Sequence, residues 1–379
     1  MRSFSRFIAT AALGSLALMF GTVGAAHAEV GHNAAAPRAV YVQTNDPAGN
    51  SVLVYNRNDD GTLTAAGSYA TGGNGGAQTG AVVDPLASQG SLAYDADAHL
   101  LLVANGGSDT VSVFGVDGSS LTLRQVVTAG GAFPTSIGVH GDLAYVLDTG
   151  GDAKVSGYRV AGGLLHPIAG SSRALGITNA NPPAFLASPG QVGFSPDGVH
   201  VIVTTKSSGT IDVFSVGADG RLSGLTANPP AGQVPFAFSF DATGHLVVVE
   251  AGTNSVSTYS VNSDNSITTV AGPVTDGQKA ACWIAGTGDG TFYVANAGSA
   301  TLSGYQVAAD GGVTLLPSTT PTAGGPIDLT VSSDGHFVYS ENGGAGTIDE
   351  FRVEADASLT ALGQITGLAA HVIEGITAS

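Results

Sequence analysis

The sequence predicts an all-β fold made of repeated units of four antiparallel strands. In residues 326–353 (PIDLTVSSDGHFVYSENGGAGTIDEFRV) three short apolar runs are separated by turn residues, and a fourth run follows at 359–365. The third run carries an aromatic residue that recurs in seven copies, at Tyr55, Phe114, Tyr158, Phe214, Tyr259, Tyr305 and Phe351. A period of roughly 45 residues with four strands per unit is typical of a β-propeller, so seven copies predict seven blades.

Aligning the copies on their first strands gives the same count. The equivalent positions are Gln89, Pro134, Pro189, Pro235, Ala281, Pro326 and Ile373. The repeats begin on a second strand at Ala39, and the chain ends with residues 373–379 (IEGITAS), which match the first-strand run 326–332 (PIDLTVS). We therefore expect the C-terminal strand to join the N-terminal blade and close the ring, which ties both ends of the domain into one sheet so that neither is left to fray.

Residues 1–28 have the pattern of a secretory signal peptide. Arg2 and Arg6 precede a short apolar run, and small residues stand at the positions that signal peptidase needs for cleavage after Ala28. The run is too short to span a membrane, so we predict no membrane span. We expect the mature protein to be periplasmic or otherwise secreted.

Composition restricts the possible partners. Cleavage would leave 10 basic residues against 29 acidic ones, a formal net charge of −19. That charge argues against a nucleic-acid or anionic-membrane partner. Cys282 is the single cysteine, so stability must come from the closed ring rather than from disulfides. We predict a disordered lead at 29–38 and one propeller domain at 39–379, present as a monomer.

Two links between blades are a dozen or so residues longer than their counterparts. They are Thr71 to Ser88 and Ser171 to Ser188, and each joins a fourth strand to the first strand of the next blade. Such links share one face of a propeller with the loops between second and third strands, and we call this face the mouth. Because long loops on a rigid scaffold commonly meet ligands, we expect a small-molecule or protein ligand at the mouth.

Polar residues expected on the mouth or the inner strands are the candidate site. The catalytic candidates are Glu250, Asp328, His371 and Glu374. The ligand-binding candidates are Ser136, Asp148, Lys206, Lys279, Trp283 and Glu341. Carboxyls, a histidine and lysines on separate blades suit general acid–base chemistry, whereas the alternative is a wet channel of solvated side chains. We predict no metal and no cofactor, because the remaining histidines are spread over different blades.

The repeats resemble those of a known family. The segments Val103-Ala104-Asn105, Tyr293-Val294-Ala295-Asn296 and Phe194-Ser195-Pro196-Asp197-Gly198 are similar to the repeat of the seven-bladed lactonase-like (YVTN-type) propellers, which include 6-phosphogluconolactonases and carboxymuconate cyclases. The resemblance covers essentially all of residues 39–379. It implies a seven-bladed propeller and, for the enzymes of the group, lactone chemistry.

The catalytic signatures of that family are altered here. Ser188 and Gly190 stand where its Pro-His-x-His-x-Val segment has histidines, and residues 325–328 (GPID) replace its Gly-Pro-Arg-His. Ala251 takes the place of the family's glutamate, with Glu250 one position earlier. The groups that would polarise a lactone carbonyl or hold a phosphate are therefore missing from their family positions.

The sequence favours the first of three functions and leaves the other two open as alternatives. The first is an exported propeller that binds a small molecule or protein at its mouth, with the catalysis of the family lost. The second is an extracytoplasmic hydrolase of sugar-type or aromatic-acid lactones. In it Glu250, Asp328 or Glu374 would activate water, His371 would act as the acid and a lysine would stabilise the oxyanion. The third is a structural platform. Convergence of these side chains on one pocket favours the enzyme.

Overall fold

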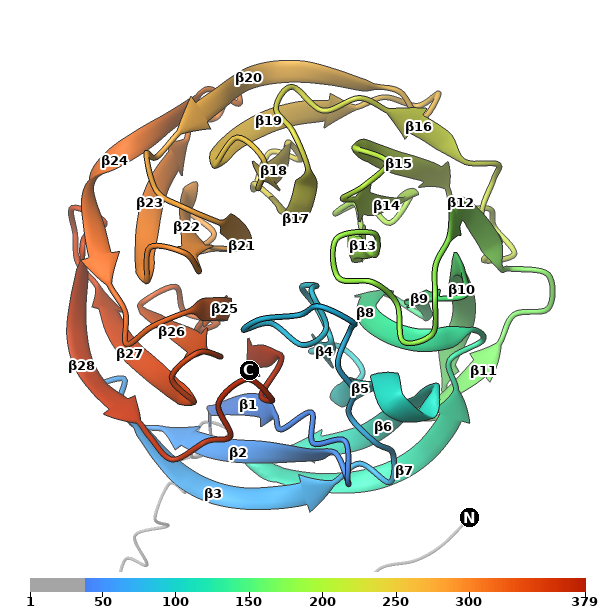
Figure 1. The fold of residues 1–379 in the computed structure, drawn as a ribbon, viewed down its shortest axis with the longest axis horizontal. Coiled ribbons are helices and arrows are strands. Elements are labelled where there is room, and N and C mark those ends of the chain that lie inside the picture. Colours follow the sequence, from blue (N-terminus) through green and yellow to red (C-terminus); the bar gives the residue numbers. More distant parts are fainter. Residues whose placement is uncertain (1–37) are drawn as a thin grey trace, which may run out of the picture. The chain divides into compact units, whose positions relative to one another are not determined.

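The computed structural model describes residues 38–379, so the expected signal peptide and most of the expected lead lie outside the described residues. In this part of the chain seven antiparallel sheets stand around a central axis (Figure 1). No helix among the described residues is long and apolar enough to span a bilayer. The predicted all-β, seven-bladed propeller is confirmed.

Each blade is a meander whose first strand lies nearest the axis. Blade 1 contains β29 (Ile376–Ala378), β1 (Ala39–Gln43), β2 (Ser51–Arg57) and β3 (Leu63–Ala70). Blade 2 contains β4 (Leu92–Asp95), β5 (Leu100–Asn105), β6 (Thr110–Asp117) and β7 (Ser120–Thr128), with the short helix η1 (Gly106–Ser108) between β5 and β6. Blade 3 contains β8 (Ala132–His140), β9 (Leu143–Gly150), β10 (Asp152–Ala161), β11 (Leu164–Pro167) and β12 (Arg173–Thr178).

The other four blades follow the same order. Blade 4 contains β13 (Pro189–Phe194), β14 (His200–Thr205), β15 (Thr210–Ser215) and β16 (Thr226–Asn228). Blade 5 contains β17 (Pro235–Phe240), β18 (Leu246–Glu250), β19 (Ser255–Val261) and β20 (Ile267–Thr275). Blade 6 contains β21 (Ala281–Gly286), β22 (Thr291–Asn296), β23 (Thr301–Val307) and β24 (Val313–Pro321). Blade 7 contains β25 (Pro326–Val331), β26 (Phe337–Asn342), β27 (Thr347–Val353) and β28 (Leu359–Ile365).

The ring closes as the sequence predicts. Strand β29 pairs antiparallel with β1, with Tyr41 opposite Thr377, so the two ends of the domain share blade 1. The recurrent aromatic of the third strand is at most 6% exposed in every blade. Phe114, for example, packs in one apolar cluster with Tyr41 of the neighbouring blade. The core therefore lies between blades, and burial of these aromatic faces holds each blade to the next.

Blade 3 departs from the regular pattern. Strand β11 is short and ends at Pro167, which has no N–H to continue the ladder. The chain leaves the sheet and returns as β12, which pairs with the same strand, β10. Part of the second long link, Ser171 to Ser188, thus completes the outer edge of a blade instead of forming an open loop.

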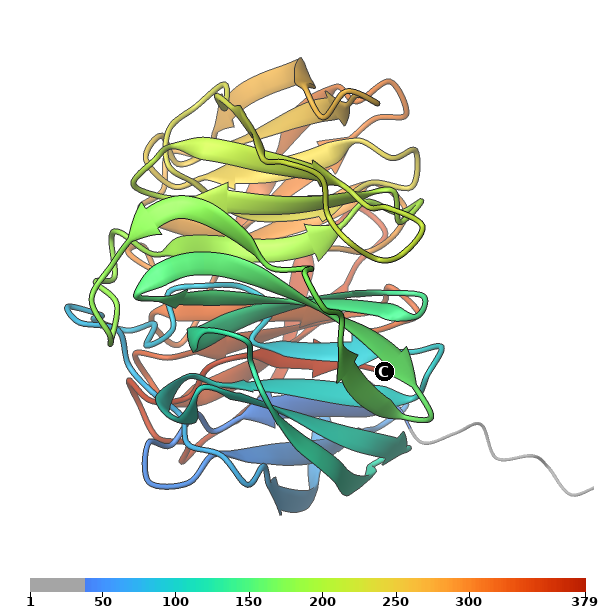
Figure 2. The same cartoon turned by 90° about the vertical axis from the view of Figure 1, so that its right-hand side faces the viewer.

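The propeller has two distinct faces, seen edge-on in Figure 2. The tight turns that join first to second and third to fourth strands lie on the turn face, where β29 ends. The loops between second and third strands and the links between blades lie on the opposite loop face, which is the expected mouth.

Candidate functional site

The mouth is filled by the first long link. Residues 71–88 cross the centre of the ring (Figure 1), and the segment Asp84 to Gln89, here called the plug, is fully buried as far as Ser88. Thr79 in the same link forms a parallel bridge to Ala184 of the second long link, so the two links are joined. The link expected to meet a ligand instead seals the axis from the loop face.

Side chains from three blades hold the plug in place. The ammonium of Lys206 donates a hydrogen bond to the carbonyl oxygen of Ala87 (2.6 Å), and the indole N–H of Trp283 donates to that of Ser88 (3.0 Å). Ser136 donates its hydroxyl proton to the carbonyl oxygen of Gln89 (2.6 Å). Lys206, Trp283 and Ser136, all predicted as ligand-binding residues, therefore contact the chain's own plug.

The side chain of Gln89 spans the axis. Its Nε2 donates to the carbonyl oxygen of Ile284 (2.8 Å), and its Oε1 accepts from the N–H of the same residue (2.9 Å). Gln89 opens blade 2 and Ile284 lies in blade 6, so this pair of bonds joins distant parts of the ring. The backbone of the plug is thereby fixed at its C-terminal end.

The first residue of the plug, Asp84, lies in a cluster with three further carboxyl groups and one lysine. We call Asp84, Lys206, Asp328, Glu341 and Glu374 the carboxyl–lysine cluster. Asp328 and Glu341 lie opposite each other in the paired strands β25 and β26. All five residues are at most 6% exposed. Four of them are predicted site residues, and the structure brings those four together.

Asp84 and Glu374 form a coupled carboxyl pair. Each shifts the pKa of the other, and two buried carboxyl groups that interact in this way do not both ionise readily. Burial raises the pKa of both groups, most strongly that of Glu374, whose pKa is raised further by the charge of Asp84. Asp84 Oδ1 also accepts a bond from the N–H of Ala87 (2.5 Å), so Asp84 is the better place for the single negative charge of the pair.

Lys206 supplies the compensating positive charge. Burial lowers its pKa to about 8, although attraction to Asp84 opposes this shift. Its ammonium also lies 5.4 Å from the ring centre of Phe185 and 5.0 Å from that of Phe236. Lys206 therefore supplies a positive charge that attracts the carboxylate of Asp84 within this buried cluster.

The other two carboxyls are held largely neutral. Burial raises the pKa of Asp328 to about 8 and that of Glu341 well above its ordinary value. Both oxygens of Glu341 lack a hydrogen-bond partner among the described residues. A carboxyl with a pKa near the working pH is suited to proton transfer, because both of its forms are populated.

A cavity reaches this cluster along the axis. It has a volume of about 290 Å³, is open to solvent and is lined by Asp328 and by residues of β17, β21, β25 and β29. Gln89 forms part of its inner end, whereas Val331 and Gly286 lie where their strands reach the turn face. The channel therefore leads from the turn face to Asp328 and stops at the plug.

Several predicted residues lie apart from the cluster. Glu250 is buried within blade 5, where Ser255, Ser257 and Tyr259 donate hydrogen bonds to it at 3.0, 2.8 and 2.5 Å. Asp148 is buried within blade 3, where it accepts a bond from Ser156 (3.1 Å). The blade satisfies Glu250, whereas Oδ1 of Asp148 has no hydrogen-bond partner among the described residues. Neither carboxyl lines the channel.

His371 and Lys279 are exposed on the loop face. The Nδ1 of His371 lies 2.9 Å from the carbonyl oxygen of Val82, on the outer side of the first long link. Glu374, three residues later, is fully buried. Because the positive φ of His371 (61°) turns the chain here, the expected partnership of His371 with Glu374 does not form.

Asp84 is the member of the cluster that the sequence analysis missed. It lies in the first long link, next to Pro85, in a stretch that belongs to no repeat. The signal was available, since Asp84 is the only acidic residue between Ser51 and Ser88 that lies outside the hairpin turn at residues 59–60. An isolated acid inside an otherwise uncharged link is a candidate for a specific interaction.

The chain belongs to the lactonase family of seven-bladed β-propellers, whose family model matches residues 158–282 and 250–372. No curated protein matches the chain. The resemblance that the repeats predict is thereby confirmed.

Solved structures show the same fold at low sequence identity. A Pseudomonas aeruginosa periplasmic gluconolactonase is 15% identical, with a TM-score of 0.69 over 90% of this chain and 98% of that one. A candidate 6-phosphogluconolactonase of Bacteroides uniformis is 16% identical, with a TM-score of 0.72 over 91% and 100%. A Lactobacillus plantarum protein is 17% identical, with a TM-score of 0.70 over 90% and 99%.

Proposed function

We propose that the protein is an exported hydrolase of sugar-type lactones, with the carboxyl–lysine cluster as its acid–base site. The single observation that carries this proposal is the open cavity that ends at Asp328, a carboxyl whose pKa burial raises to about 8. Membership of the lactonase family and the fold shared with a periplasmic gluconolactonase support it. The missing histidines and arginine of the family are replaced, in this proposal, by carboxyls.

The reaction needs one base and one acid. Ionised Asp328 takes a proton from a water molecule as its oxygen attacks the lactone carbonyl. The ring C–O bond then breaks, and the departing ring oxygen takes from Asp328 the proton that Asp328 accepted from water, which restores the ionised carboxylate. The product is an open hydroxy acid, whose new carboxyl releases the proton that a pH-stat records. Lys206 remains on the plug and keeps one charge of the Asp84–Glu374 pair compensated.

Hydrolysis of glucono-δ-lactone and of an aromatic-acid lactone tests the proposal. We expect turnover above the spontaneous rate, with kcat/KM rising with pH through about 8 as Asp328 loses its proton. Asp328→Asn should lower kcat/KM at least 100-fold. The matched control is Asp212→Asn, which changes a carboxyl that is also buried but lies within blade 4.

Absence of enzymatic turnover on every lactone, or equal rates in wild type and Asp328→Asn, would overturn the proposal. The pH profile is recorded against an enzyme-free blank at each pH, because lactones open spontaneously in base.

A binding function without turnover is the second candidate. The joined links of the loop face expose two large aliphatic side chains, Val82 at 73% and Leu186 at 74%. Exposed apolar groups on a loop surface are typical of protein contacts. This alternative is favoured if no lactone is hydrolysed and if Val82→Ser with Leu186→Ser abolishes a protein interaction of the mature chain.

A further inference from the structure

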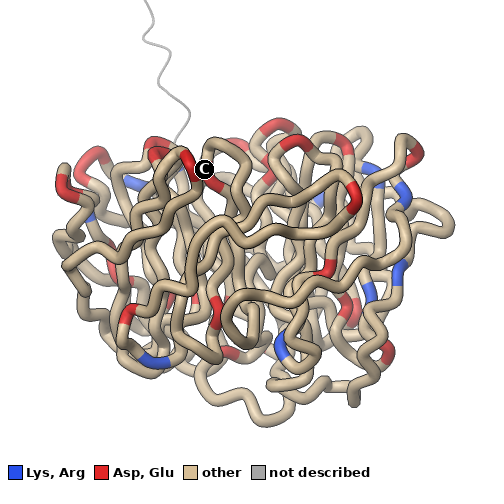
Figure 3. Tube along the Cα trace, turned by 90° about the horizontal axis from the view of Figure 1, so that it is seen from above, with Lys and Arg blue, Asp and Glu red and all other residues tan. Residues whose placement is uncertain are grey.

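The charge of the turn face bears on what can enter the channel. Figure 3 shows acidic residues gathered along the edge of the molecule at which the chain ends. All six first-to-second-strand turns, those of blades 2 to 7, carry an aspartate, at Asp97, Asp142, Asp197, Asp241, Asp289 and Asp334. Because these turns follow the inner strands, they surround the outer end of the channel. We call them the aspartate ring.

Local hydrogen bonds favour the charged form of two members of this ring, Asp197 and Asp289. Ser195 donates to Asp197 Oδ1 and Thr287 donates to Asp289 Oδ1, both at 2.6 Å. These bonds lower the pKa of each carboxyl below its ordinary value. Neither carboxylate forms an ion pair with a described residue, whereas Asp142, Asp241 and Asp334 do. Asp197 and Asp289 therefore present uncompensated charge near the entrance.

The other route to the cluster is closed. The plug is tied to blades 3, 4 and 6 by Ser136, Lys206 and Trp283, and its backbone is fully buried as far as Ser88. The cavity that reaches Asp328 instead follows the inner strands to the turn face. A molecule that approaches Asp328 must therefore pass the aspartate ring.

We infer that substrate enters from the turn face and that the aspartate ring selects uncharged lactones over anionic ones such as phosphorylated sugar lactones. The selection has a physical basis, because a surface of one charge sign lowers the local concentration of ions of that sign. Inside the channel, a phosphate would meet carboxyl groups and the one lysine that is bonded to the plug. This inference rests on the proposed function for its substrate, but the route and the charge selection can be measured separately.

An introduced cysteine reports on the route without any need for activity. Asp328→Cys, made in a Cys282→Ser background, places a thiol at the inner end of the cavity that Asp328 lines. Cys282 itself is removed because it does not line the cavity and burial raises the pKa of its thiol to about 12. Modification of the introduced thiol is followed by mass spectrometry with two reagents, neutral methyl methanethiosulfonate and anionic sulfonatoethyl methanethiosulfonate. Each rate is divided by the rate of the same reagent with the unfolded protein.

Two variants distinguish entry of the reagent from the turn face from entry from the loop face. Ser239→Trp narrows the channel on the turn-face side, since Ser239 lines the cavity. Val82→Trp enlarges an exposed side chain on the loop face and is the matched control. We expect Ser239→Trp to slow modification by the neutral reagent at least tenfold, whereas Val82→Trp should change it less than twofold. If Val82→Trp slows the modification and Ser239→Trp does not, the proposed route is wrong.

The proposed charge selection is tested separately, by comparing the two reagents with the aspartate ring intact and in a variant of the aspartate ring. We expect the neutral reagent to react at least tenfold faster than the anionic one at low salt, and this ratio to shrink as salt is added. Asp197→Asn with Asp289→Asn should raise the anionic rate several-fold and leave the neutral rate unchanged, because asparagine Oδ1 can still accept the bonds of each turn. If the rate of modification by the anionic reagent changes neither with salt nor with these substitutions, the proposed charge selection is wrong.

Hydrolysis assays on the same variants distinguish the two proposals. If wild type opens glucono-δ-lactone but Ser239→Trp retains full activity, the lactonase proposal stands and the route is wrong. If cysteine modification follows the predicted route and no lactone is opened, the channel and its selection stand and the lactonase proposal is wrong. Preference of wild type for a 6-phosphorylated lactone over the unphosphorylated one would contradict the selection alone.

Discussion

Asp328 links the protonation of one side chain to the stability of the whole domain. Burial raises its pKa from 3.8 to about 8, so the folded protein holds this proton over a pH range in which the unfolded chain releases it. The contribution of this proton to the free energy of unfolding is fully present below about pH 4 and is lost as the pH rises towards 8. One group of this kind changes the free energy of unfolding by at most about 1.4 kcal/mol per pH unit.

We therefore expect Asp328→Asn, which cannot titrate, to gain stability relative to wild type as pH rises from 5 to 8. Chemical denaturation at a series of pH values measures the difference. A constant offset between the two proteins over this range would show that Asp328 does not have the raised pKa.

Lys206 has a second testable role as the cationic member of the cluster. Lys206→Met removes the donor to Ala87 and the charge that compensates the Asp84–Glu374 pair. Removal of one member of a buried pair costs about 3 kcal/mol or more. The control, Lys279→Met, changes an exposed lysine and should cost less than about 0.5 kcal/mol. Equal effects in urea denaturation would mean that Lys206 carries no buried charge.

At the scale of elements, the plug depends on the twin bond of Gln89. Gln191 makes an equivalent twin bond, but to Phe238 of the neighbouring blade (2.7 and 3.1 Å). We expect Gln89→Ala and Gln191→Ala each to cost about 2 kcal/mol, at about 1 kcal/mol per lost bond. Only Gln89→Ala should speed hydrogen exchange at the amides of Leu86 and Ala87, because it alone releases the plug. Similar exchange in both variants would contradict this role.

The strands could be predicted from the sequence because their signals are local. Alternating apolar residues, Asp-Gly turns and one aromatic per third strand recur in every blade, so errors in one copy are corrected by the others. The exception is blade 3, where Pro167 divides the outer strand and the repeat gives no warning of β12. A single proline acts on one copy only and leaves the period intact.

The site could be predicted only in part, for a physical reason. Asp328 and Glu341 belong to paired strands, so the repeat places them near the axis. Asp84 approaches them from a link outside the repeat, and no periodicity says where that link folds. His371 is close to Glu374 in sequence, but a local backbone turn with φ of 61° sends it to the surface.

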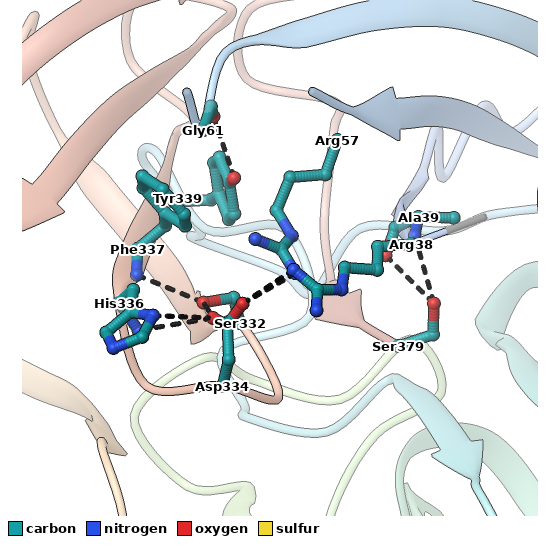
Figure 4. A network of polar contacts seen from close by, with 10 residues as sticks. All are labelled: Arg38, Ala39, Arg57, Gly61, Ser332, Asp334, His336, Phe337, Tyr339 and Ser379. Carbon is teal, nitrogen blue, oxygen red and sulfur yellow. Dashed lines mark hydrogen bonds and ion pairs between the residues drawn. The ribbon is translucent and has the colours of Figure 1, made fainter. Parts of the chain in front are cut away.

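At the scale of the whole molecule, one network fastens the ring where its ends meet. Figure 4 shows Arg38, Arg57 and Ser379 of the first blade beside Asp334 of the last. Asp334 Oδ2 accepts bonds from Arg57 (2.9 Å) and Arg38 (3.0 Å). The side chain of Arg57 is only 2% exposed and lies 5.3 Å from the ring centre of Phe337. The ion pair therefore crosses the last interface between blades out of contact with most of the solvent.

Asp334→Ala should accordingly destabilise the protein far more than loss of an ordinary surface pair. It leaves the Arg57 guanidinium buried without a carboxylate, at a cost of about 3 to 5 kcal/mol. Asp219→Ala breaks an ion pair with Arg221 in which both side chains are at least half-exposed, and such pairs contribute about 0 to 1 kcal/mol. Thermal unfolding of the two variants makes the comparison. A similar fall in Tm for both would mean that pairing of β29 with β1 closes the ring without help from Asp334.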